Sequence, residues 1–207
     1  MRKITVIGTG YVGLVSGAGI SDFGHQVVCA DIVEEKVNLL KNGEIPIYEP
    51  GLSDLVKRNV IAGRLSFTAD VDQAIQSADV IFIAVGTPQG DNGEANISAV
   101  ESVATSIGKN LNTYKVICTK STVPIGTGDL ICELIQAAKE ESDKVLAQKD
   151  AEIATLRAKV KELNDEKAVM QQRLDIFKAH QREQLDVVSE VEAEAEVCNL
   201  HDSTDYE

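Results

Sequence analysis

A short strand-like run that meets a glycine-rich turn near the N-terminus constrains the fold of this chain more than any other feature. Residues 4–7 are Ile, Thr, Val and Ile, the turn has the spacing G-x-G-x-x-G at Gly8, Gly10 and Gly13, and an apolar helical pattern covers residues 14–23. A buried strand, a tight turn and a helix N-terminus come in this order in dinucleotide-binding sites. Gly8 would permit the sharp turn. Gly10, which has no side chain, would let a pyrophosphate come close to the backbone, and Gly13 would let the helix pack closely on the strand.

An acidic residue at the end of the second predicted strand strengthens this interpretation. The strand covers residues 26–30, and Asp31 follows it, 18 residues after Gly13. A carboxylate at about this spacing binds the adenosine ribose, because it accepts hydrogen bonds from the hydroxyls and repels a 2′-phosphate. No Arg directly follows Asp31. The pattern therefore predicts NAD rather than NADP, with the alternative that Asp31 only ends a strand and binds no ligand.

The composition narrows the class of protein. With 20 Lys and Arg against 33 Asp and Glu, the net charge is −13, which argues against a nucleic-acid partner because phosphate binding draws on clustered cations. The four cysteines, Cys29, Cys118, Cys132 and Cys198, form no C-x-x-C pair and no zinc-ligand spacing, which is typical of free thiols in a reducing compartment. The N-terminal residues lead straight into a core strand, and no apolar run approaches 18 residues. We therefore expect a cytoplasmic protein without a signal peptide, membrane span or metal site.

Predicted strands and helices alternate over the first two-thirds of the chain. The predicted strands are residues 3–7, 26–30, 65–68, 80–85 and 115–120, and the predicted helices are residues 11–23, 34–42, 52–62, 70–77 and 97–109. Residues 80–85 form a continuous apolar run, as expected for a central parallel strand that is covered on both faces. This alternation predicts an α/β fold with a Rossmann-like doubly wound parallel sheet, in which ligands bind at the carboxyl ends of the strands.

Two loops that follow predicted strands place hydroxyl side chains at this ligand-binding edge. V-G-T-P at residues 85–88 includes Thr87, and S-T-V-P-I-G-T at residues 121–127 includes Thr122. Each loop also contains a proline, which stiffens its backbone. We expect both loops to lie beside the glycine turn, with the alternative that their hydroxyls only cap the helices that follow.

Several motifs together resemble the N-terminal domain of one enzyme family. The glycine turn, Asp31, the segment P-I-Y-E-P-G-L at residues 46–52 and the two hydroxyl-bearing loops resemble those of the UDP-glucose/GDP-mannose dehydrogenases, most closely the UDP-glucose 6-dehydrogenases. The resemblance covers residues 1–138. The family oxidises the primary alcohol of a nucleotide sugar to a carboxylate with two NAD molecules, through an enzyme-bound thiohemiacetal and thioester. The resemblance implies NAD-binding roles for Gly8, Gly10, Tyr11, Val12, Gly13, Asp31, Lys36, Thr87 and Thr122, and it implies that Thr122 helps to position a catalytic water.

The resemblance also implies residues that this sequence does not supply. In the family a nucleophilic cysteine lies in a glycine-rich loop of a later domain, and the substrate contacts lie mostly beyond the NAD-binding part. A nucleophilic thiol must reach the substrate carbon and have a lowered pKa. Cys29 and Cys118 fall in predicted strands, Cys132 falls in a helix, and Cys198 lies among acidic residues. We therefore expect all four to be structural or incidental, and this chain alone to be catalytically incomplete.

The remainder of the sequence has a different character. All 15 glycines and all four prolines lie at or before Gly128. Spacings of three and four residues alternate along the set Ile153, Leu156, Val160, Leu163, Lys167, Met170, Leu174 and Phe177, and after an irregularity near Gln181 the set continues at Leu185 and Val188. This is a coiled-coil seam with Lys167 as its polar member. We expect a Rossmann domain over residues 1–138, a long helix over 139–189 and a disordered acidic tail over 190–207.

The sequence leaves the partners and the activity open. A long isolated helix is marginal in water, so the seam needs a partner: a second copy of the chain, which a narrow seam favours, or the sheet of the same chain or another protein. One hypothesis is the NAD-binding part of a nucleotide-sugar 6-dehydrogenase. The others are a non-catalytic NAD-binding scaffold or sensor, dimerised by its coiled coil, and a truncated or chimeric gene product. We expect NAD binding without unaided oxidation of UDP-glucose.

Overall fold

The structure, a computed structural model, describes residues 1–90 and 93–202, and it describes side chains up to residue 183. Contacts divide the chain into two compact units, Met1–Leu146 and Ala147–Glu207. The first contains the whole sheet, and residues 147–202 of the second belong to one helix.

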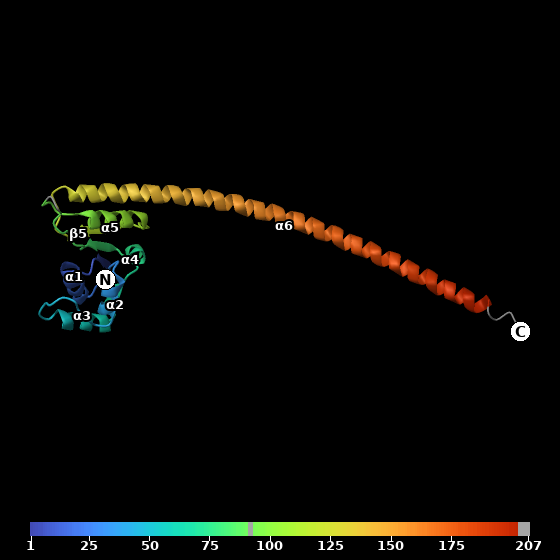
Figure 1. The fold of residues 1–207 in the computed structure, drawn as a ribbon, viewed down its shortest axis with the longest axis horizontal. Coiled ribbons are helices and arrows are strands. Elements are labelled where there is room, and N and C mark those ends of the chain that lie inside the picture. Colours follow the sequence, from blue (N-terminus) through green and yellow to red (C-terminus); the bar gives the residue numbers. More distant parts are fainter. Residues whose placement is uncertain (91–92, 203–207) are drawn as a thin grey trace. The chain divides into compact units, whose positions relative to one another are not determined.

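The first unit is built on a five-stranded sheet in which every strand is parallel to its neighbours (Figure 1). The strands are β1 (Lys3–Ile7), β2 (Gln26–Ala30), β3 (Leu65–Thr68), β4 (Val80–Ile83) and β5 (Val116–Thr119), in the order β3-β2-β1-β4-β5. The order reverses between β1 and β4, which is the switch point at which doubly wound sheets bind their ligands. The predicted α/β fold is confirmed.

Helices connect these strands, and one very long helix follows the last of them. The helices are α1 (Tyr11–Asp22), α2 (Glu34–Lys41), α3 (Leu52–Ile61), α4 (Val71–Ser77), α5 (Ser98–Lys109) and α6 (Thr127–Asp202). Local sequence explains several of their starts: the Asp70 carboxylate accepts a hydrogen bond from the Gln73 N–H at 2.9 Å and caps α4. Gly51 and Gly126 precede α3 and α6 with φ of 81° and 88°, a conformation that glycine adopts without strain.

The two faces of the sheet carry two separate hydrophobic cores. Successive residues of a strand point to opposite faces, so Ile4 and Val6 of β1 pack with α1, α2 and α3, whereas Ile7 packs with α4 and α5 on the other face. Thr5, which lies between Ile4 and Val6 in the strand, is also buried, and its hydroxyl donates to the Ala74 carbonyl of α4 at 2.8 Å. Helices cover both faces, which explains why β4 is apolar throughout.

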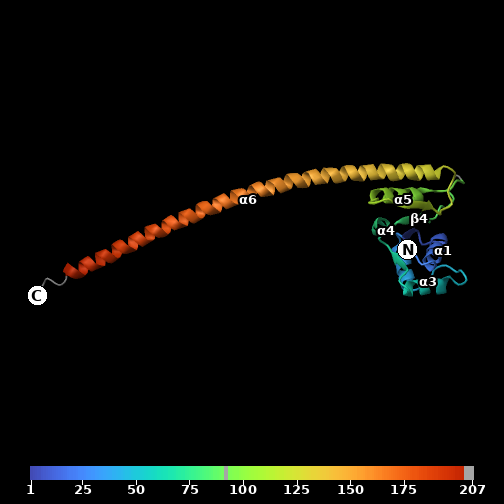
Figure 2. The ribbon, with the colours of Figure 1, turned by 180° about the vertical axis from the view of Figure 1, so that it is seen from behind.

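The first turns of α6 belong to the second of these cores. Ile131 and Ile135 are buried in it, and Figures 1 and 2 both show the start of α6 beside α5. Gly108 of α5 makes this close approach possible: a Cβ at Gly108 would lie 2.4 Å from the Ile135 carbonyl oxygen and 2.7 Å from Cβ of Ala138. The sheet domain therefore includes the N-terminal part of α6.

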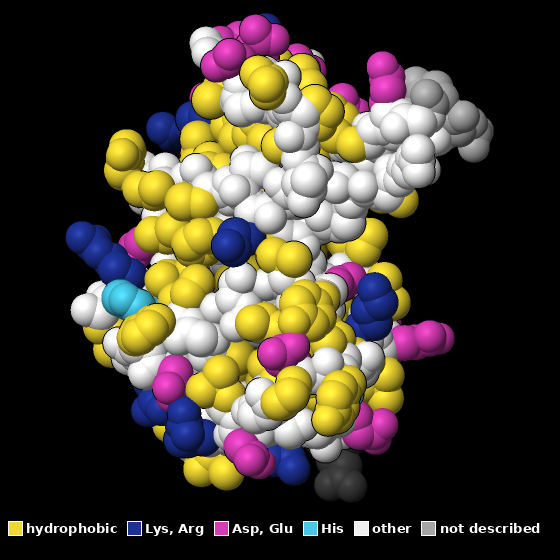
Figure 3. All heavy atoms as spheres, turned by 90° about the vertical axis from the view of Figure 1, so that its left-hand side faces the viewer, with side chains coloured by type: hydrophobic (Ala, Val, Ile, Leu, Met, Phe, Trp, Pro, Cys, Tyr) yellow, Lys and Arg dark blue, Asp and Glu magenta, His cyan; other side chains and the backbone are white. Residues whose placement is uncertain are grey.

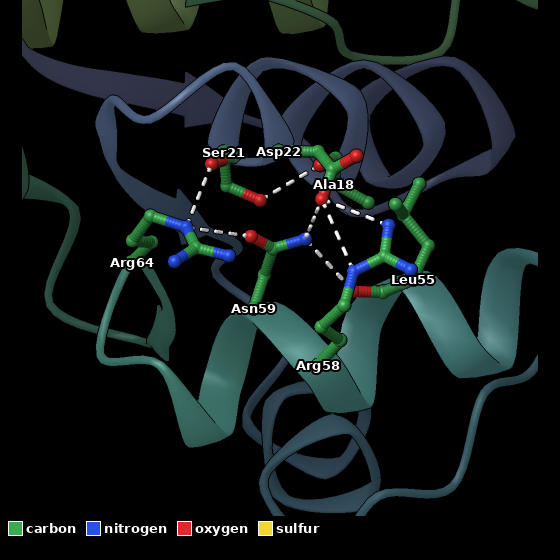
Figure 4. A network of polar contacts seen from close by, with 7 residues as sticks. All are labelled: Ala18, Ser21, Asp22, Leu55, Arg58, Asn59 and Arg64. Carbon is green, nitrogen blue, oxygen red and sulfur yellow. Dashed lines mark hydrogen bonds and ion pairs between the residues drawn. The ribbon is translucent and has the colours of Figure 1, made fainter.

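A polar network joins the C-terminal end of α1 to α3 (Figure 4). At its centre Asn59, which is fully buried, donates to the Asp22 carboxylate at 3.2 Å and to the Leu55 carbonyl at 2.9 Å. Its carbonyl oxygen accepts from Nε of Arg64 at 2.9 Å. The amide is thus paired on both sides, as a buried polar group must be if its burial is not to destabilise the fold.

Most predicted element boundaries agree with the structure within two residues, and the differences have physical reasons. β4 ends at Ile83 and β5 at Thr119, because the chain leaves the sheet there and forms the loops at the ligand-binding edge. α6 passes without a break through the predicted domain boundary at 138/139, since that stretch contains neither Gly nor Pro. The division into three segments stays a prediction.

The backbone of α6 is helical through Asp202, where a disordered tail was expected from residue 190; residues 203–207 lie outside the described residues. The predicted continuation of the seam at Leu185 and Val188 also falls outside the described side chains.

No helix in the described part of the chain is long and apolar enough to span a membrane. On the face seen in Figure 3, Lys and Arg side chains are interspersed with acidic and hydrophobic ones.

Candidate functional site

A cavity of about 750 Å³ opens at the carboxyl ends of the central strands. It begins at the glycine turn after β1, passes the end of β2 and extends between the start of α4 and one side of α5. Its lining residues are Ile7, Gly8, Gly10, Asp31, Ile32, Val33, Lys36, Ala69, Asp70, Val71, Asp72, Ala84, Val85, Gly86, Ala99, Ser102, Val103 and Ser106. This volume and this position at the switch point are those of a cofactor site.

The glycine turn forms the floor of this cavity. Gly8 has φ of 105°, and a Cβ there would lie 2.5 Å from the Ala84 carbonyl oxygen. A Cβ at Gly13 would lie 1.8 Å from the Gly8 carbonyl oxygen, so helix α1 meets the turn only because both residues lack side chains. Gly10 differs, because a Cβ there would meet no heavy atom within 4 Å. The chain leaves open space in front of Gly10.

The N-terminus of α1 adjoins this open space. Gly10 caps the helix without a side chain, and the first hydrogen bond of the helix runs from the Leu14 N–H to the Gly10 carbonyl at 2.9 Å. The N–H groups of the first turn, which include those of Tyr11 and Val12, are therefore not used within the helix. These groups and the positive end of the helix dipole suit an anion.

Asp31 is held directly beside the turn. One of its oxygens, Oδ2, accepts from the Thr9 N–H at 2.8 Å and from the Thr9 hydroxyl at 2.7 Å, while Oδ1 accepts from the Val33 N–H at 3.1 Å. Burial raises the pKa of Asp31, but the Thr9 and Val33 hydrogen bonds and the charge of Lys36 outweigh it and hold the pKa below its usual value. The carboxylate is therefore ionised at neutral pH and fixed in orientation.

The two hydroxyl-bearing loops are bound to each other at the same edge. The Thr87 hydroxyl donates to the Thr122 carbonyl at 2.7 Å, and the Ser121 hydroxyl donates to the Val85 carbonyl at the same distance. Neither Thr87 nor Thr122 lines the cavity itself. The Thr122 side chain is exposed.

One wall of the cavity was not predicted from the sequence. Ala99, Ser102, Val103 and Ser106 lie on one face of α5, with the spacing i, i+3, i+4, i+7. Asp70 and Asp72 at the start of α4 were missed too. The small size of these α5 residues was the available signal, but only the fold brings this face and Asp31 to the same cavity.

Thr9 was also missed, although it lies between the first two glycines of the turn. Near it, the Tyr11 hydroxyl donates to the Glu49 carboxylate, which joins the start of α1 to the loop before α3. This hydrogen bond and the negative charge of Glu49 raise the pKa of Tyr11. The P-I-Y-E-P-G-L segment therefore reaches the glycine turn through Glu49.

None of the cysteines with described side chains lines the cavity. Cys29 is fully buried against α1, and burial raises its pKa to about 12, so the thiol stays protonated and unreactive. Cys118 is half-buried in β5 and Cys132 is exposed on α6. Cys198 lies outside the described side chains. Among the described residues, no group of three or more His, Cys, Asp and Glu is arranged to hold a metal ion.

A search of family models matches residues 2–156 to the UDP-glucose/GDP-mannose dehydrogenase family, NAD binding domain. UDP-glucose 6-dehydrogenase TuaD of Bacillus subtilis is 56% identical over 140 residues, which are 68% of this chain and 30% of that enzyme. UDP-glucose 6-dehydrogenase of Rhizobium meliloti is 53% identical over 143 residues, or 68% of this chain and 32% of that enzyme. The chain thus spans about a third of the length of these relatives.

Solved structures of similar proteins agree with this match. A UDP-glucose dehydrogenase from the archaeon Pyrobaculum islandicum has a TM-score of 0.65 at 36% identity, over 67% of this chain and 33% of that one. A GDP-mannose dehydrogenase from Pseudomonas aeruginosa, solved as a ternary complex, also has a TM-score of 0.65 at 36% identity, over 68% and 33%. Both similarities cover about two-thirds of this chain, as the matches to the curated relatives do.

Proposed function

The chain belongs to the UDP-glucose/GDP-mannose dehydrogenase family, and from that membership we propose that its 750 Å³ cavity binds NAD. The observation that carries this proposal is the Asp31 carboxylate, ionised and hydrogen-bonded to Thr9 within the glycine turn. A ribose-binding acid and an open phosphate-binding turn are thereby held at adjacent points of one cavity.

Each part of the cavity corresponds to one part of the cofactor. The pyrophosphate lies in the open space at Gly10 and accepts hydrogen bonds from the N–H groups of Tyr11, Val12 and Gly13. The adenosine ribose donates to Oδ1 of Asp31, because both Thr9 hydrogen bonds go to Oδ2. The adenine lies against the small α5 face, which offers apolar contact and two Ser hydroxyls.

The remaining residues of the site have supporting roles in this proposal. Lys36 lines the cavity beside Asp31 and provides a positive charge near the phosphates. Thr87 and Thr122 lie where the nicotinamide end leaves the glycine turn, and their hydrogen bond fixes the two loops relative to each other. Thr122, by family resemblance, positions a water for the oxidation.

The charge of the ribose end favours NAD over NADP. Asp31, Asp70 and Asp72 all line this end of the cavity, and Lys36 is the one cation among its lining residues. A 2′-phosphate would bring about −2 charge next to an ionised Asp31. Two unit charges about 4 Å apart repel by roughly 4 kcal/mol near a protein surface. The site therefore selects NAD over NADP by repelling the 2′-phosphate as well as by hydrogen bonding to the ribose.

The reaction that this domain serves is the oxidation of a nucleotide sugar at its primary alcohol, with NAD as hydride acceptor. The named relatives with this activity are about three times longer than the matched segment. None of the cysteines with described side chains reaches the cavity, so the nucleophilic thiol of the family reaction has no counterpart there. We propose that this chain binds NAD and does not oxidise UDP-glucose unaided.

A second candidate function is an NAD-binding scaffold or sensor that acts as a homodimer. The observation that favours it is the exposed apolar seam of α6, which has no use in an isolated NAD-binding domain. Both candidates share the NAD site and predict no turnover by this chain alone. Following NADH absorbance with NAD and UDP-glucose tests that expectation: NAD binding without reduction supports the proposal, and sustained reduction would overturn it.

Calorimetric titration of the full chain tests the cofactor site. Gly10→Ala and Gly19→Ala form a matched pair, because a Cβ meets no heavy atom within 4 Å at either glycine. Both variants should fold with wild-type stability. Gly10→Ala should weaken NAD binding by about tenfold or more, or roughly 1.4 kcal/mol, because its methyl group occupies the pyrophosphate space, whereas Gly19→Ala should bind normally. Equal NAD affinity of the two variants, or no binding by the wild type, would contradict the proposal.

A further inference from the structure

Helix α6 carries a stripe of exposed apolar side chains after the sheet domain ends. Its seven members are Ile153, Leu156, Val160, Leu163, Met170, Leu174 and Phe177, and each is between 44% and 68% exposed. They recur at alternating spacings of three and four residues, with Lys167 in the one remaining position of the repeat. A stripe this regular and this narrow has the dimensions of a coiled-coil seam rather than those of a globular helix face.

We infer that a second copy of this chain covers the stripe, as a parallel, in-register, two-stranded coiled coil. The first heptad position holds Ile153, Val160, Lys167 and Leu174, and the fourth holds Leu156, Leu163, Met170 and Phe177. Two of the first positions are β-branched and two of the fourth are Leu. This distribution favours parallel dimers over trimers or tetramers. The inference rests on the homodimer named in the proposed function.

Charges beside the stripe fit the parallel arrangement. Glu152 flanks the stripe on one side, and in a parallel pair it faces Arg157 of the second copy, five residues further along. Lys167 lies next to Glu166 of the second copy, which partners the one charge within the seam. Arg173 and Lys178 of the second copy form one like-charged pair. The parallel arrangement therefore makes two kinds of attractive charge contact and one kind of repulsive contact.

The antiparallel alternative fits less well. In the antiparallel register that places Ile153 opposite Phe177, Lys167 of each copy lies opposite Leu163 of the other copy. The lysine charge is then buried against an apolar side chain in two separate layers of the coiled coil. It also brings Glu166 next to its own counterpart and Lys159 next to Arg173. Parallel pairing confines the polar contact to a single layer, and one polar layer at this heptad position is a known determinant of register.

The rest of the helix surface is that of an exposed coiled-coil exterior. Lys159 forms an ion pair with Glu162 at 2.9 Å within the same chain, and Gln171 donates to Asp175 at 2.9 Å. Both pairs keep the outer face solvated. Val169 and Ile176 are the large apolar exceptions among the exposed side chains there, and they lie two positions after Lys167 and Leu174. The apolar surface is concentrated where a second helix would cover it.

Disulfide trapping in the full chain tests both the pairing and its direction. In a background with Cys118, Cys132 and Cys198 changed to Ser, Leu156→Cys places one thiol in the seam, and Ala158→Cys places one on the outer face. In a parallel, in-register pair, the two thiols introduced by Leu156→Cys come within the range that a disulfide bridges. Met170→Cys repeats the test at a second seam position and guards against local disruption by the first substitution.

The expected result is a dimer by sedimentation, with self-crosslinking of Leu156→Cys and Met170→Cys and not of Ala158→Cys. A dimer in which Leu156→Cys crosslinks only to a Leu174→Cys chain is antiparallel and overturns the inference, while the homodimer proposal stands. A monomer at high micromolar concentration overturns both, as does a higher oligomer or a stripe occupied by the chain's own sheet. NAD calorimetry on the same protein is independent of each outcome.

Discussion

Thr9 donates its backbone N–H and its hydroxyl to the same oxygen of Asp31, at 2.8 Å and 2.7 Å. A carboxylate has about four acceptor positions, and the Val33 N–H occupies a third at 3.1 Å. One position remains, on Oδ1. The glycine turn therefore orients the acid that we propose binds the ribose, and it leaves that acid one free acceptor for a ligand hydroxyl.

Removing only the Thr9 hydroxyl tests this arrangement. Thr9→Val should weaken NAD binding about fivefold, because the loss of one hydrogen bond worth about 1 kcal/mol lets the carboxylate rotate. Thr5→Val is the matched control, since the Thr5 hydroxyl is equally buried and donates to Ala74 at 2.8 Å, and neither of these residues lines the cavity. Both variants should lose about 1 kcal/mol of stability in urea unfolding. Equal NAD affinities in calorimetry would show that Thr9 has no role in the site.

Replacing the acid itself should change cofactor preference. Asp31→Asn removes the negative charge, and its amide has one acceptor oxygen in place of two. NAD should bind about tenfold more weakly, as expected for the loss of a charge-assisted hydrogen bond. NADP should lose less affinity than NAD, because the repulsion of the 2′-phosphate disappears with the charge. Parallel titrations with both cofactors measure the ratio, and an unchanged ratio would remove Asp31 from the selectivity argument.

The lowered pKa of Asp31 predicts how stability depends on pH. The folded-state pKa lies below the unfolded value of about 3.9, so the folded state holds the proton less tightly than the unfolded chain. The stability from the Thr9 and Val33 hydrogen bonds is then fully present above about pH 5, and it declines as the pH falls through the folded-state pKa. The stability difference between wild type and Asp31→Asn in urea should be constant from pH 8 to about 5 and shrink below pH 4. A difference that grows on acidification would contradict the assigned shift.

The strands and the glycine turn were predictable from sequence because their causes are local. A β-branched run such as Ile4 to Ile7 specifies a buried strand, and the glycines of the turn are needed for reasons that act within a few residues. The absence of Gly and Pro after Gly128 similarly predicts an unbroken helix. Each of these features depends on neighbours in the chain.

The wall that α5 contributes was not predictable in this way. Ser102 and Ser106 line the cavity only because β4 is placed next to β1, which brings the connecting helix α5 to the same cavity as the glycine turn. Strand order is a property of the whole sheet. Thr9 was missed for a different reason: its hydroxyl acts on Asp31, 22 residues away, and such a pairing is visible only in three dimensions.

The network at the other end of α1 should affect stability and not cofactor binding. Asn59→Ala leaves Nε of Arg64 without one of its acceptors and removes a fully buried amide, so we expect a loss of about 2–3 kcal/mol in urea unfolding. Arg58→Ala is the control. Its ion pair with Asp22 is largely exposed, and such pairs contribute at most about 1 kcal/mol. Calorimetry should give wild-type NAD affinity for both variants, because the glycine turn lies at the opposite end of α1.

Lys167 sets a compromise between stability and specificity in the proposed coiled coil. A charged residue at a seam position weakens a dimer, but it penalises every register in which it would meet an apolar layer. Lys167→Ile should therefore raise the thermal midpoint of the helix, measured by circular dichroism at 222 nm. It should also broaden the distribution of oligomers in sedimentation, because an uninterrupted apolar seam accepts other registers and stoichiometries.

Lys161→Ile is the matched control for this change, because residue 161 is exposed and lies outside the seam. It makes the same replacement, so it separates the effect of seam position from that of added hydrophobicity. The control should leave the thermal midpoint nearly unchanged and the dimer intact. If Lys161→Ile and Lys167→Ile behave alike, the heptad assignment is wrong. If Lys167→Ile lowers the midpoint instead, the lysine forms a net stabilising contact, and Glu166 of the second copy is the acceptor to test next by Glu166→Gln.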